Sequence, residues 1–414
     1  MNEHEYIDFE ETVHELLYDI IHLDPLAFSS PEFHEATTDD IFDLFYAEWL
    51  DADLISGDDD PISELLFGAI VEHADSFFQL HFQPRSSPDT YVKTSPLNIE
   101  TKLCHLSNLP QPTQKTLEWH QYRHELMTAS NIWKVFASDS QRNSLIYEKC
   151  KPFSAENKGN WHSTGSLQWG VLYEPLSILL YETIFKTKVR DYGCIQHPQY
   201  KCIGASPDGI NVCPDSERYG RMLEVKNIVN REITGIPKEE YWIQMHLQME
   251  TCDIDDCDFL ETRFKEYATE EEFHGDVSRE WKGIILCFIQ RNLLNSKPTY
   301  RYSPLGVAYD VATWTAETRE AVKAEDLVLF STTHWYLDQL SCVYVQRNRT
   351  WFSGALPQIL DTWTTIERER ETGYEHRAAA KRVTDIFIST DGGVDTHLIH
   401  NMKIPPSICL VKLE

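Results

Sequence analysis

Charge divides this sequence into two unlike parts. Residues 1–80 contain 22 Asp and Glu but neither Lys nor Arg, and the first basic residue is Arg85. The other 44 acidic residues share the rest of the chain with all 37 basic ones, so that part contributes only −7 to the net charge of −29. A strongly acidic segment is repelled by nucleic acid, whereas a nearly neutral domain can carry a local basic groove. We therefore expect a separate acidic module over residues 1–82.

The acidic module carries apolar residues at helical spacing, which predicts a small helical bundle. These residues are Leu16, Leu17, Ile20, Ile21, Ile41, Leu44, Phe45, Leu50, Leu65, Leu66 and Ile70. Helix starts are expected at Thr37-Thr38-Asp39-Asp40 and at Asp58–Asp60 before Pro61. Three roles are open for its charge: mimicry of DNA over a basic cleft, docking of a single-strand-annealing partner, or solubility.

The remaining chain reads as a linker, an α/β domain and a tail. Residues 83–116 contain five prolines amid Ser, Thr and Asn, which is typical of a linker. Residues 117–383 are expected to form a domain with a central mixed sheet flanked by helices and a largely helical extension over 311–383; residues 384–414 form the tail. Expected helices span about 121–136, 145–150, 166–186 (perturbed at Pro175) and 238–251, and expected strands span 192–195, 202–205, 209–212, 222–226, 259–264, 283–290 and 299–302.

Composition argues against several classes of protein. No apolar run approaches the roughly 20 residues of a membrane helix, and the N-terminus lacks the pattern of a signal sequence. The ten cysteines include no CxxC pair, and Cys252 and Cys257 lack two further ligands for zinc. We expect a soluble intracellular protein with reduced thiols and no membrane partner.

Residues 204–228 carry the strongest chemical signal. Asp208 is followed sixteen positions later by Glu224-Val225-Lys226. Because side chains alternate along a strand, Glu224 and Lys226 should share one face while Val225 packs on the other. If Asp208 begins a strand antiparallel to this one, its carboxylate lies beside Glu224. Such a carboxylate pair suits Mg²⁺, and the lysine can position an attacking water. Each motif alone is common in turns and exposed strands, so the prediction rests on their order and spacing.

Six motifs in this order resemble the phage lambda-type exonuclease family, also described as YqaJ-like viral recombinases, of the PD-(D/E)xK nuclease superfamily. They are Trp119-His120-x-x-Arg123, Thr128-Ala129-Ser130, Gly170-x-x-x-Glu174-Pro175, Gly204-Ala205-Ser206-Pro207-Asp208-Gly209, Glu224-Val225-Lys226 and Tyr241-x-x-Gln244. Trp335-Tyr336, Cys342 and Trp351-Phe352 look similar to versions from large DNA viruses of eukaryotes. The resemblance implies an α/β PD-(D/E)xK restriction-endonuclease-like core.

The resemblance also implies roles for individual residues. Metal ligands would be Glu174, Asp208, Glu224 and the backbone carbonyl of Val225, holding Mg²⁺, or Mn²⁺ in its place, with two ions during catalysis. Lys226 and Gln244 would complete the catalytic group with the two carboxylates. Arg123, Ser130 and Ser206 would grip a terminal 5′-phosphate, and Tyr241 would contact DNA. The family often has glycine where this chain has Glu125, and an acid there repels phosphate unless it points outward.

The activity implied is 5′-to-3′ exonuclease hydrolysis of double-stranded DNA in viral recombination, repair or processing of replication intermediates. Implied partners are duplex DNA with a 5′ end, a single-strand-annealing or single-strand-binding protein, and further copies of the chain; a viral protein would act in the host cytoplasm or nucleus. Two alternatives are an endonuclease or DNA-end processor with the same site, and a catalytically weak recombination adaptor. The complete set Asp208, Glu224 and Lys226 argues against the adaptor. Cys104, Cys150 and Cys342 lack the spacing of an iron–sulfur cluster.

Overall fold

The structure is a computed structural model that describes residues 3–57, 61–81, 85–88, 98–154, 166–291, 298–305 and 311–379. Its eleven strands are β1 Ser87–Pro88, β2 Met127–Thr128, β3 Val189–Arg190, β4 Ile195–Gln196, β5 Ile203–Ala205, β6 Gly209–Asn211, β7 Met222–Asn227, β8 Asp256–Glu266, β9 Lys282–Gln290, β10 Thr299–Tyr302 and β11 Leu327–Gln346. Eight of these described strands form one sheet in the order β10-β9-β11-β8-β7-β6-β3, with β1 also paired to β11. β7 and β8 run parallel, and the other pairs of this sheet are antiparallel. A second sheet has the order β2-β5-β4.

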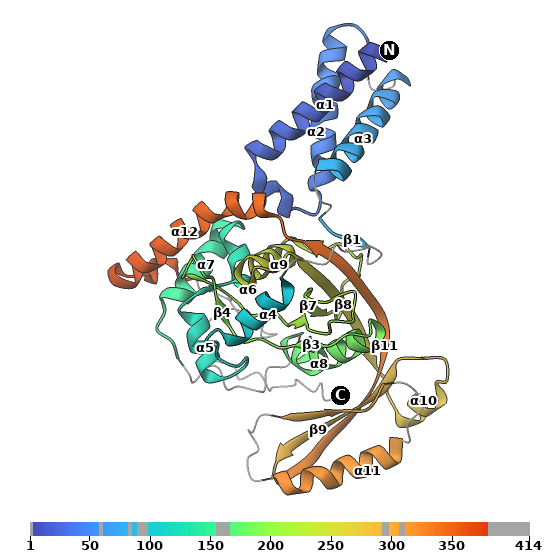
Figure 1. The fold of residues 1–414 in the computed structure, drawn as a ribbon, viewed down its shortest axis with the longest axis vertical. Helices are drawn as coiled ribbons and strands as arrows, with labels where there is room; N and C mark the ends of the chain where they lie inside the picture. The colour runs from blue at the N-terminus through green and yellow to red at the C-terminus, as the bar shows by residue number, and fades with distance from the viewer. Residues whose placement is uncertain are drawn as a thin grey trace, which may run out of the picture.

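Helices cover both faces of the large sheet (Figure 1). α8 packs on one face against β7 and β8, and α9 packs on the other side against β8 and β5. The described helices of this part are α4 Ile99–Asn108, α5 Leu117–His124, α6 Ala129–Ile132, α7 Asp139–Cys150, α8 Ser166–Ile184, α9 Glu239–Cys252, α10 Glu270–Gly275, α11 Val311–Ala321 and α12 Arg349–Thr372. This arrangement confirms the predicted mixed sheet flanked by helices.

The alternation of side chains along β7 matches the prediction. Leu223 and Val225 pack with Tyr181 of α8 on one face of the sheet. Met222 belongs to the larger core that includes Trp242 of α9. Because the side-chain period of a strand is two, the even-numbered residues of β7 face the α9 side, and this places Glu224 and Lys226 there.

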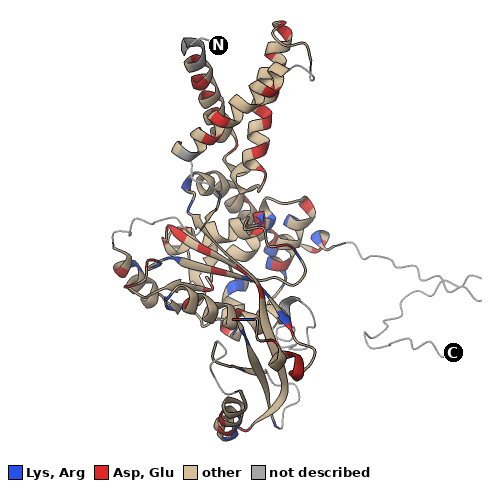
Figure 2. Cartoon of the chain, turned by 90° about the vertical axis from the view of Figure 1, so that its right-hand side faces the viewer, with Lys and Arg blue, Asp and Glu red and all other residues tan. Residues whose placement is uncertain are grey.

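The acidic N-terminal module is a bundle of α1 Glu3–Leu23, α2 Phe33–Asp51 and α3 Pro61–His81, with the short helix η1 Pro25–Ser29 at its base. α3 begins at Pro61 as predicted. α2 begins at Phe33, before the predicted Thr37-Thr38 start, because the Phe33 ring packs on Phe28 and Phe78 and draws the earlier residues into the helix. Acidic residues, coloured red, are spread along the helices of the bundle (Figure 2).

The bundle joins the core through its base. Ser29 Oγ donates to Glu239 Oε1 of α9 at 2.7 Å, and Arg85 donates to the Ser29 carbonyl at 2.9 Å. From this base the three helices extend away from the sheet, so they do not lie over β7 (Figure 1). A DNA-mimicking cover over the cleft, one of the three expected roles, is therefore not the arrangement that the structure shows.

Two expected elements need correction. The region 311–383, expected to be largely helical, is helical in α11 and α12, but residues 327–346 between them form β11, whose two halves pair with β9 and β8 in the middle of the sheet. The expected helix 121–136 is broken, since Met127 donates its N–H to the carbonyl of Cys202 at 2.8 Å and forms β2 beside β5. Both segments form strands because they pair with residues far away in the sequence.

The expected linker, 83–116, contains β1 and α4, and the tail 384–414 lies outside the described residues. None of the described helices combines the length and apolar character that crossing a bilayer requires.

A buried charge network should stabilise the sheet behind the site. Asp258 of β8 is fully buried and contacts Arg218 Nη1 at 2.5 Å and Arg221 Nη1 at 2.9 Å. We expect Asp258→Asn to lower the free energy of unfolding by about 3–5 kcal/mol, because it removes the buried negative charge that both guanidinium groups contact. Urea denaturation followed by tryptophan fluorescence measures this loss. In the exposed pair Lys323–Glu320, Lys323→Ala should cost at most about 1 kcal/mol; equal losses in both variants would contradict the account.

Candidate active site

Asp208 and Glu224 lie together because β6 and β7 pair antiparallel. Gly209 is opposite Leu223 in this pair, and Asp208 immediately precedes β6. The Asp208 carboxylate accepts the backbone N–H of Val225 through Oδ2 at 2.8 Å. This hydrogen bond fixes the carboxylate beside the strand that carries Glu224 and Lys226. The geometry expected from the spacing of the two motifs is therefore present.

Glu224 is a fully buried carboxylate surrounded by donors. Its Oε1 accepts Lys226 Nζ at 2.5 Å and Gln244 Nε2 at 2.7 Å, and its Oε2 accepts Gln248 Nε2 at 2.8 Å. Lys226 Nζ also donates to Gln244 Oε1 at 3.3 Å. A buried charge costs several kcal/mol unless it is paired and hydrogen-bonded, and these contacts supply that compensation. α9 thus provides two amides to this one carboxylate.

The expected metal ligands form a concentration of negative charge. Burial raises the pKa of Asp208 well above its usual value, and the charges of Glu224 and Glu174 raise it further, against the opposing effects of Lys226 and the Val225 N–H. Glu174 reaches this group from α8, where it also accepts Lys115 Nζ at 2.8 Å. Carboxylates that repel each other in this way are the donors that a hard divalent cation neutralises. The donor set therefore fits Mg²⁺ or Mn²⁺, and the ligand role of the Val225 carbonyl stays a prediction.

Lys226 keeps its positive charge in this setting. Burial by itself lowers the pKa of an amine, but the neighbouring carboxylates of Glu224 and Asp208 outweigh it, so the pKa of Lys226 lies above its ordinary value. The centroid of the Tyr241 ring lies 4.8 Å from Lys226 Nζ and 5.7 Å from Arg231 Cζ, so the ring contacts both cations. The four expected catalytic residues and Tyr241 are therefore brought together.

The expected phosphate-binding residues also converge. Arg123 of α5 donates to Ser130 Oγ of α6 at 2.8 Å. It also donates, at 3.3 Å, to Ser206 Oγ in the loop before Asp208. Its guanidinium lies 4.3 Å from the Trp119 ring centroid, and Trp119 Nε1 donates to Ser206 Oγ at 3.1 Å. Thr128 Oγ1 completes the group at 3.3 Å from Arg123. An arginine fork with three hydroxyls is suited to bind a phosphate.

The unusual acid in this region points outward. Glu125 is exposed, and its carboxylate contacts His124 Nδ1 at 3.1 Å and Arg370 Nη1 of α12 at 3.3 Å. Its charge is therefore balanced by Arg370, and the departure from the family pattern does not place a carboxylate among the hydroxyls.

Some site residues were not expected from the sequence. Gln248 was left out, yet it is buried and donates to Glu224; its position one helical turn after Gln244 was the available signal. Trp119 and Thr128 belong to two of the six family-like motifs, but the sequence predicted no role for either residue. Lys115 falls in the expected linker, and nothing in its local sequence indicates its contact with Glu174.

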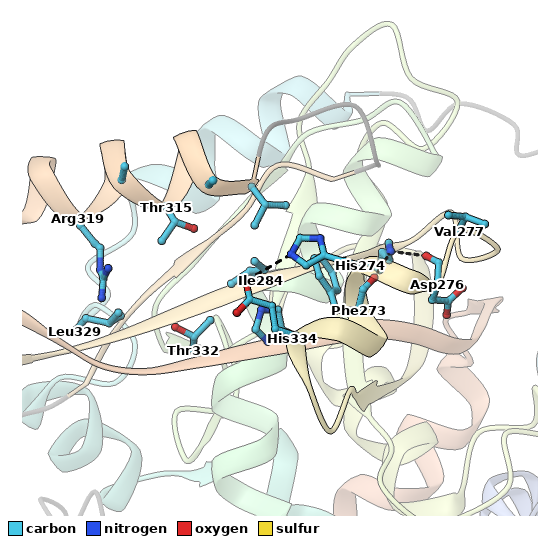
Figure 3. A pocket seen from close by; sticks show the side chains of 15 residues that line it. Phe273, His274, Asp276, Val277, Ile284, Thr315, Arg319, Leu329, Thr332 and His334 are labelled. Carbon is cyan, nitrogen blue, oxygen red and sulfur yellow. Dashed lines mark hydrogen bonds and ion pairs between the residues drawn. The ribbon is translucent and has the colours of Figure 1, made fainter.

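A separate cavity of about 820 Å³ lies between α10, α11 and the strands β9 and β11 (Figure 3). Its lining includes His274, Arg319 and His334, and none of the expected site residues. Lys282 in its wall is engaged by the carbonyls of Phe273 and Asp276. The cavity is therefore not part of the carboxylate site.

Comparisons with known proteins agree with the resemblance seen in the sequence. Residues 118–255 match the YqaJ-like viral recombinase domain, the one to which the motifs in this region show a resemblance. An uncharacterized protein of Acanthamoeba polyphaga mimivirus is 26% identical over 338 residues, which are 72% of this chain and 60% of that protein. The chain thus spans less than two thirds of this relative.

The solved structures that match this chain include an alkaline exonuclease from Laribacter hongkongensis, at 18% sequence identity and a TM-score of 0.38. The match covers 63% of this chain and 97% of that exonuclease. A phage-related exonuclease from Haemophilus somnus matches at 14% identity and a TM-score of 0.31, covering 59% and 94% of the two chains.

The raised pKa of Asp208 predicts a pH-dependent stability. An aspartate in the unfolded chain has a pKa of about 3.9. Because the folded pKa is higher, the folded state binds the proton more tightly, and stability falls as pH rises from that value through the folded pKa. In EDTA, Asp208→Asn should therefore be more stable than the wild type at pH 8, with the difference shrinking toward pH 4. Urea denaturation at several pH values measures it, with the exposed Asp215→Asn as control. A variant that is less stable at every pH would contradict the assignment.

Proposed function

We propose that this protein is a metal-dependent deoxyribonuclease that degrades double-stranded DNA from a 5′ end. The observation that carries the proposal is the convergence of Asp208, Glu224 and Lys226 beside the hydroxyl-lined Arg123. The match of residues 118–255 to the YqaJ-like viral recombinase domain supports a nuclease.

The carboxylates of Glu174, Asp208 and Glu224, with the carbonyl of Val225, would hold Mg²⁺, or Mn²⁺ in its place, with two ions during catalysis. A metal bound there would supply an acidified water and would neutralise charge that builds up on the scissile phosphate. The protein residues hold these ligands in place: the Val225 N–H orients Asp208, and Gln248 orients the distal oxygen of Glu224. Pre-organisation of this kind avoids rearrangement during the reaction.

Lys226 acts as a positioned cation. An ammonium group has three protons to donate, and two are directed at Glu224 Oε1 and Gln244 Oε1. The third can contact the attacking water or an oxygen of the scissile phosphate. Gln244 spans Glu224 and Lys226, and so it holds the lysine in a fixed orientation. Tyr241 covers the ammonium with its ring and limits its access to bulk water.

The 5′ direction rests on the Arg123 group. A terminal 5′-phosphate carries more charge than a phosphodiester, and Arg123 with Ser130, Ser206 and Thr128 offers donors on several sides of it. Trp119 stacks on the guanidinium and keeps the arginine from reaching solvent. Anchoring the terminal phosphate near the carboxylates would set which phosphodiester is cut. The 3′ strand left by this reaction would serve recombination together with a single-strand-annealing or single-strand-binding protein. The enzyme would act as a homo-oligomer in the host cytoplasm or nucleus.

Removal of a catalytic group should abolish hydrolysis. We expect Lys226→Ala and Glu224→Gln to reduce degradation of linear duplex DNA in Mg²⁺ by about 1000-fold, since each removes charge stabilisation from the transition state. Lys265→Ala, an exposed lysine on the neighbouring β8, should retain full activity. Wild-type protein that binds linear duplex but leaves it intact in Mg²⁺ and in Mn²⁺ would exclude the enzyme and favour an adaptor.

Loss of the arginine should act on the end of the DNA. Arg123→Ala is expected to slow hydrolysis of 5′-phosphorylated duplex by about 10- to 100-fold, the cost of a charge-assisted contact, while 5′-hydroxyl duplex changes little. An equal loss on both substrates would refute terminal-phosphate recognition. Cleavage of closed circular duplex at a rate comparable to linear DNA would favour an endonuclease instead.

A further inference from the structure

Two histidines and a glutamate converge inside the N-terminal bundle, far along the chain from the nuclease site. Glu10 and His14 lie one turn apart on α1, and His73 faces them from α3. One ligand atom from each of the three lies within 4.8 Å of the others. His73 Nδ1 is 4.0 Å from Glu10 Oε1. Residues four apart on a helix share a face, so α1 presents both of its groups to the same point on α3.

The cluster lies at the border of the apolar core of the bundle. His73 is only 4% exposed, and its ring packs against Phe9 at 5.7 Å. The His14 ring lies 5.1 Å from Phe77 and 6.3 Å from the His73 ring. The Nε2 atoms of both histidines are shielded from solvent, whereas Glu10 is partly exposed. One side of the cluster is therefore fixed by packing, and the other is open to an incoming ion.

The charge of the bundle favours a cation at this point. Residues 1–80 supply 22 carboxylates and no lysine or arginine, so neither of these permanently charged side chains from this segment lies among the carboxylates. The summed field of these acids raises the local concentration of divalent cations. Acidic charge alone is not selective, but the two imidazoles are, because nitrogen donors favour zinc over magnesium or calcium.

We propose that Glu10, His14 and His73 bind one Zn²⁺ ion, which links α1 to α3. Two histidines and one carboxylate are an established zinc donor set, with a water in the fourth position. Zinc–ligand distances of about 2.0–2.2 Å require the three side chains to draw closer together than they lie here, and Glu10 and His14 are exposed enough to move. The site is independent of the nuclease site, whose oxygen donors select Mg²⁺.

Zinc would tie the bundle together by linkage. A ligand that binds the folded state alone stabilises it by an amount that grows with its concentration over its dissociation constant. The ion joins the first helix of the chain to the third, so it fixes the two segments that are most distant in the sequence of the module. The bundle would then present its acidic surface as a rigid unit to a partner.

The test uses the full-length chain carrying Asp208→Asn and Glu224→Gln, so that the nuclease site binds no metal. Titration with Co²⁺ alone, followed by its visible absorption, should show one four-coordinate site that Zn²⁺ displaces in equimolar amount. Adding His14→Gln, His73→Gln or Glu10→Gln should weaken this site by at least about 100-fold, more than the loss of an outer-shell partner costs. His22→Gln, an exposed histidine on the same helix, is the matched control and should bind as the parent does.

Circular dichroism of each variant checks that the bundle remains folded. If His73→Gln unfolds the bundle, the test is made with His14→Gln and Glu10→Gln, which change partly exposed residues. Equal Co²⁺ and Zn²⁺ binding by the parent and by His14→Gln would overturn the proposal, as would the absence of a four-coordinate spectrum in the parent. Neither result bears on the hydrolysis of DNA, which is measured on the chain without the two background substitutions.

Discussion

The burial of the Glu224 carboxylate is the constraint on which the rest of the site depends. A charged group in the interior between β7 and α9 is tolerated only where donors surround it. Lys226 supplies one from the same face of the strand, and Gln244 and Gln248 supply two from successive turns of α9. A shift of one residue in the β7 register would exchange Glu224 for an apolar neighbour and leave the two amides without their acceptor. The register of the strand and the orientation of the helix are therefore specified together.

The C-terminal extension supports this arrangement from behind. α12 places Trp351, which is fully buried, 5.3 Å from the Trp242 ring of α9. His246, one turn after Trp242, is stacked on that ring, and its burial lowers its pKa to about 3, so it stays neutral in the core. Its Nδ1 hydrogen-bonds the Trp242 carbonyl at 2.8 Å. Thus α9 is held by aromatic packing on the side opposite its glutamines, and α12 supports the position of the site through this packing.

The sequence predicted the local parts of this structure and missed those that depend on distant partners. Asp208 and Glu224-Val225-Lys226 could be found because a strand places alternate residues on one face, whatever surrounds it. The strand β11 was missed between two helical segments, although it is rich in β-branched and aromatic residues, because its pairing with β8 and β9 fixes its conformation. Gln248 was missed because a buried glutamine has a recognisable role only when the carboxylate opposite it is known. The contact of Lys115 with Glu174 joins segments 59 residues apart and has no local signal.

Binding of a divalent cation at the carboxylates tests the central claim most directly. Crystals of the wild-type protein soaked in Mn²⁺ and measured at the manganese absorption edge would locate the ion by its anomalous signal. The account predicts a peak between the carboxylates of Asp208 and Glu224, within coordination distance of both and with Glu174 on the same side, and no peak in Asp208→Asn crystals. Manganese bound only elsewhere at saturating metal would contradict it.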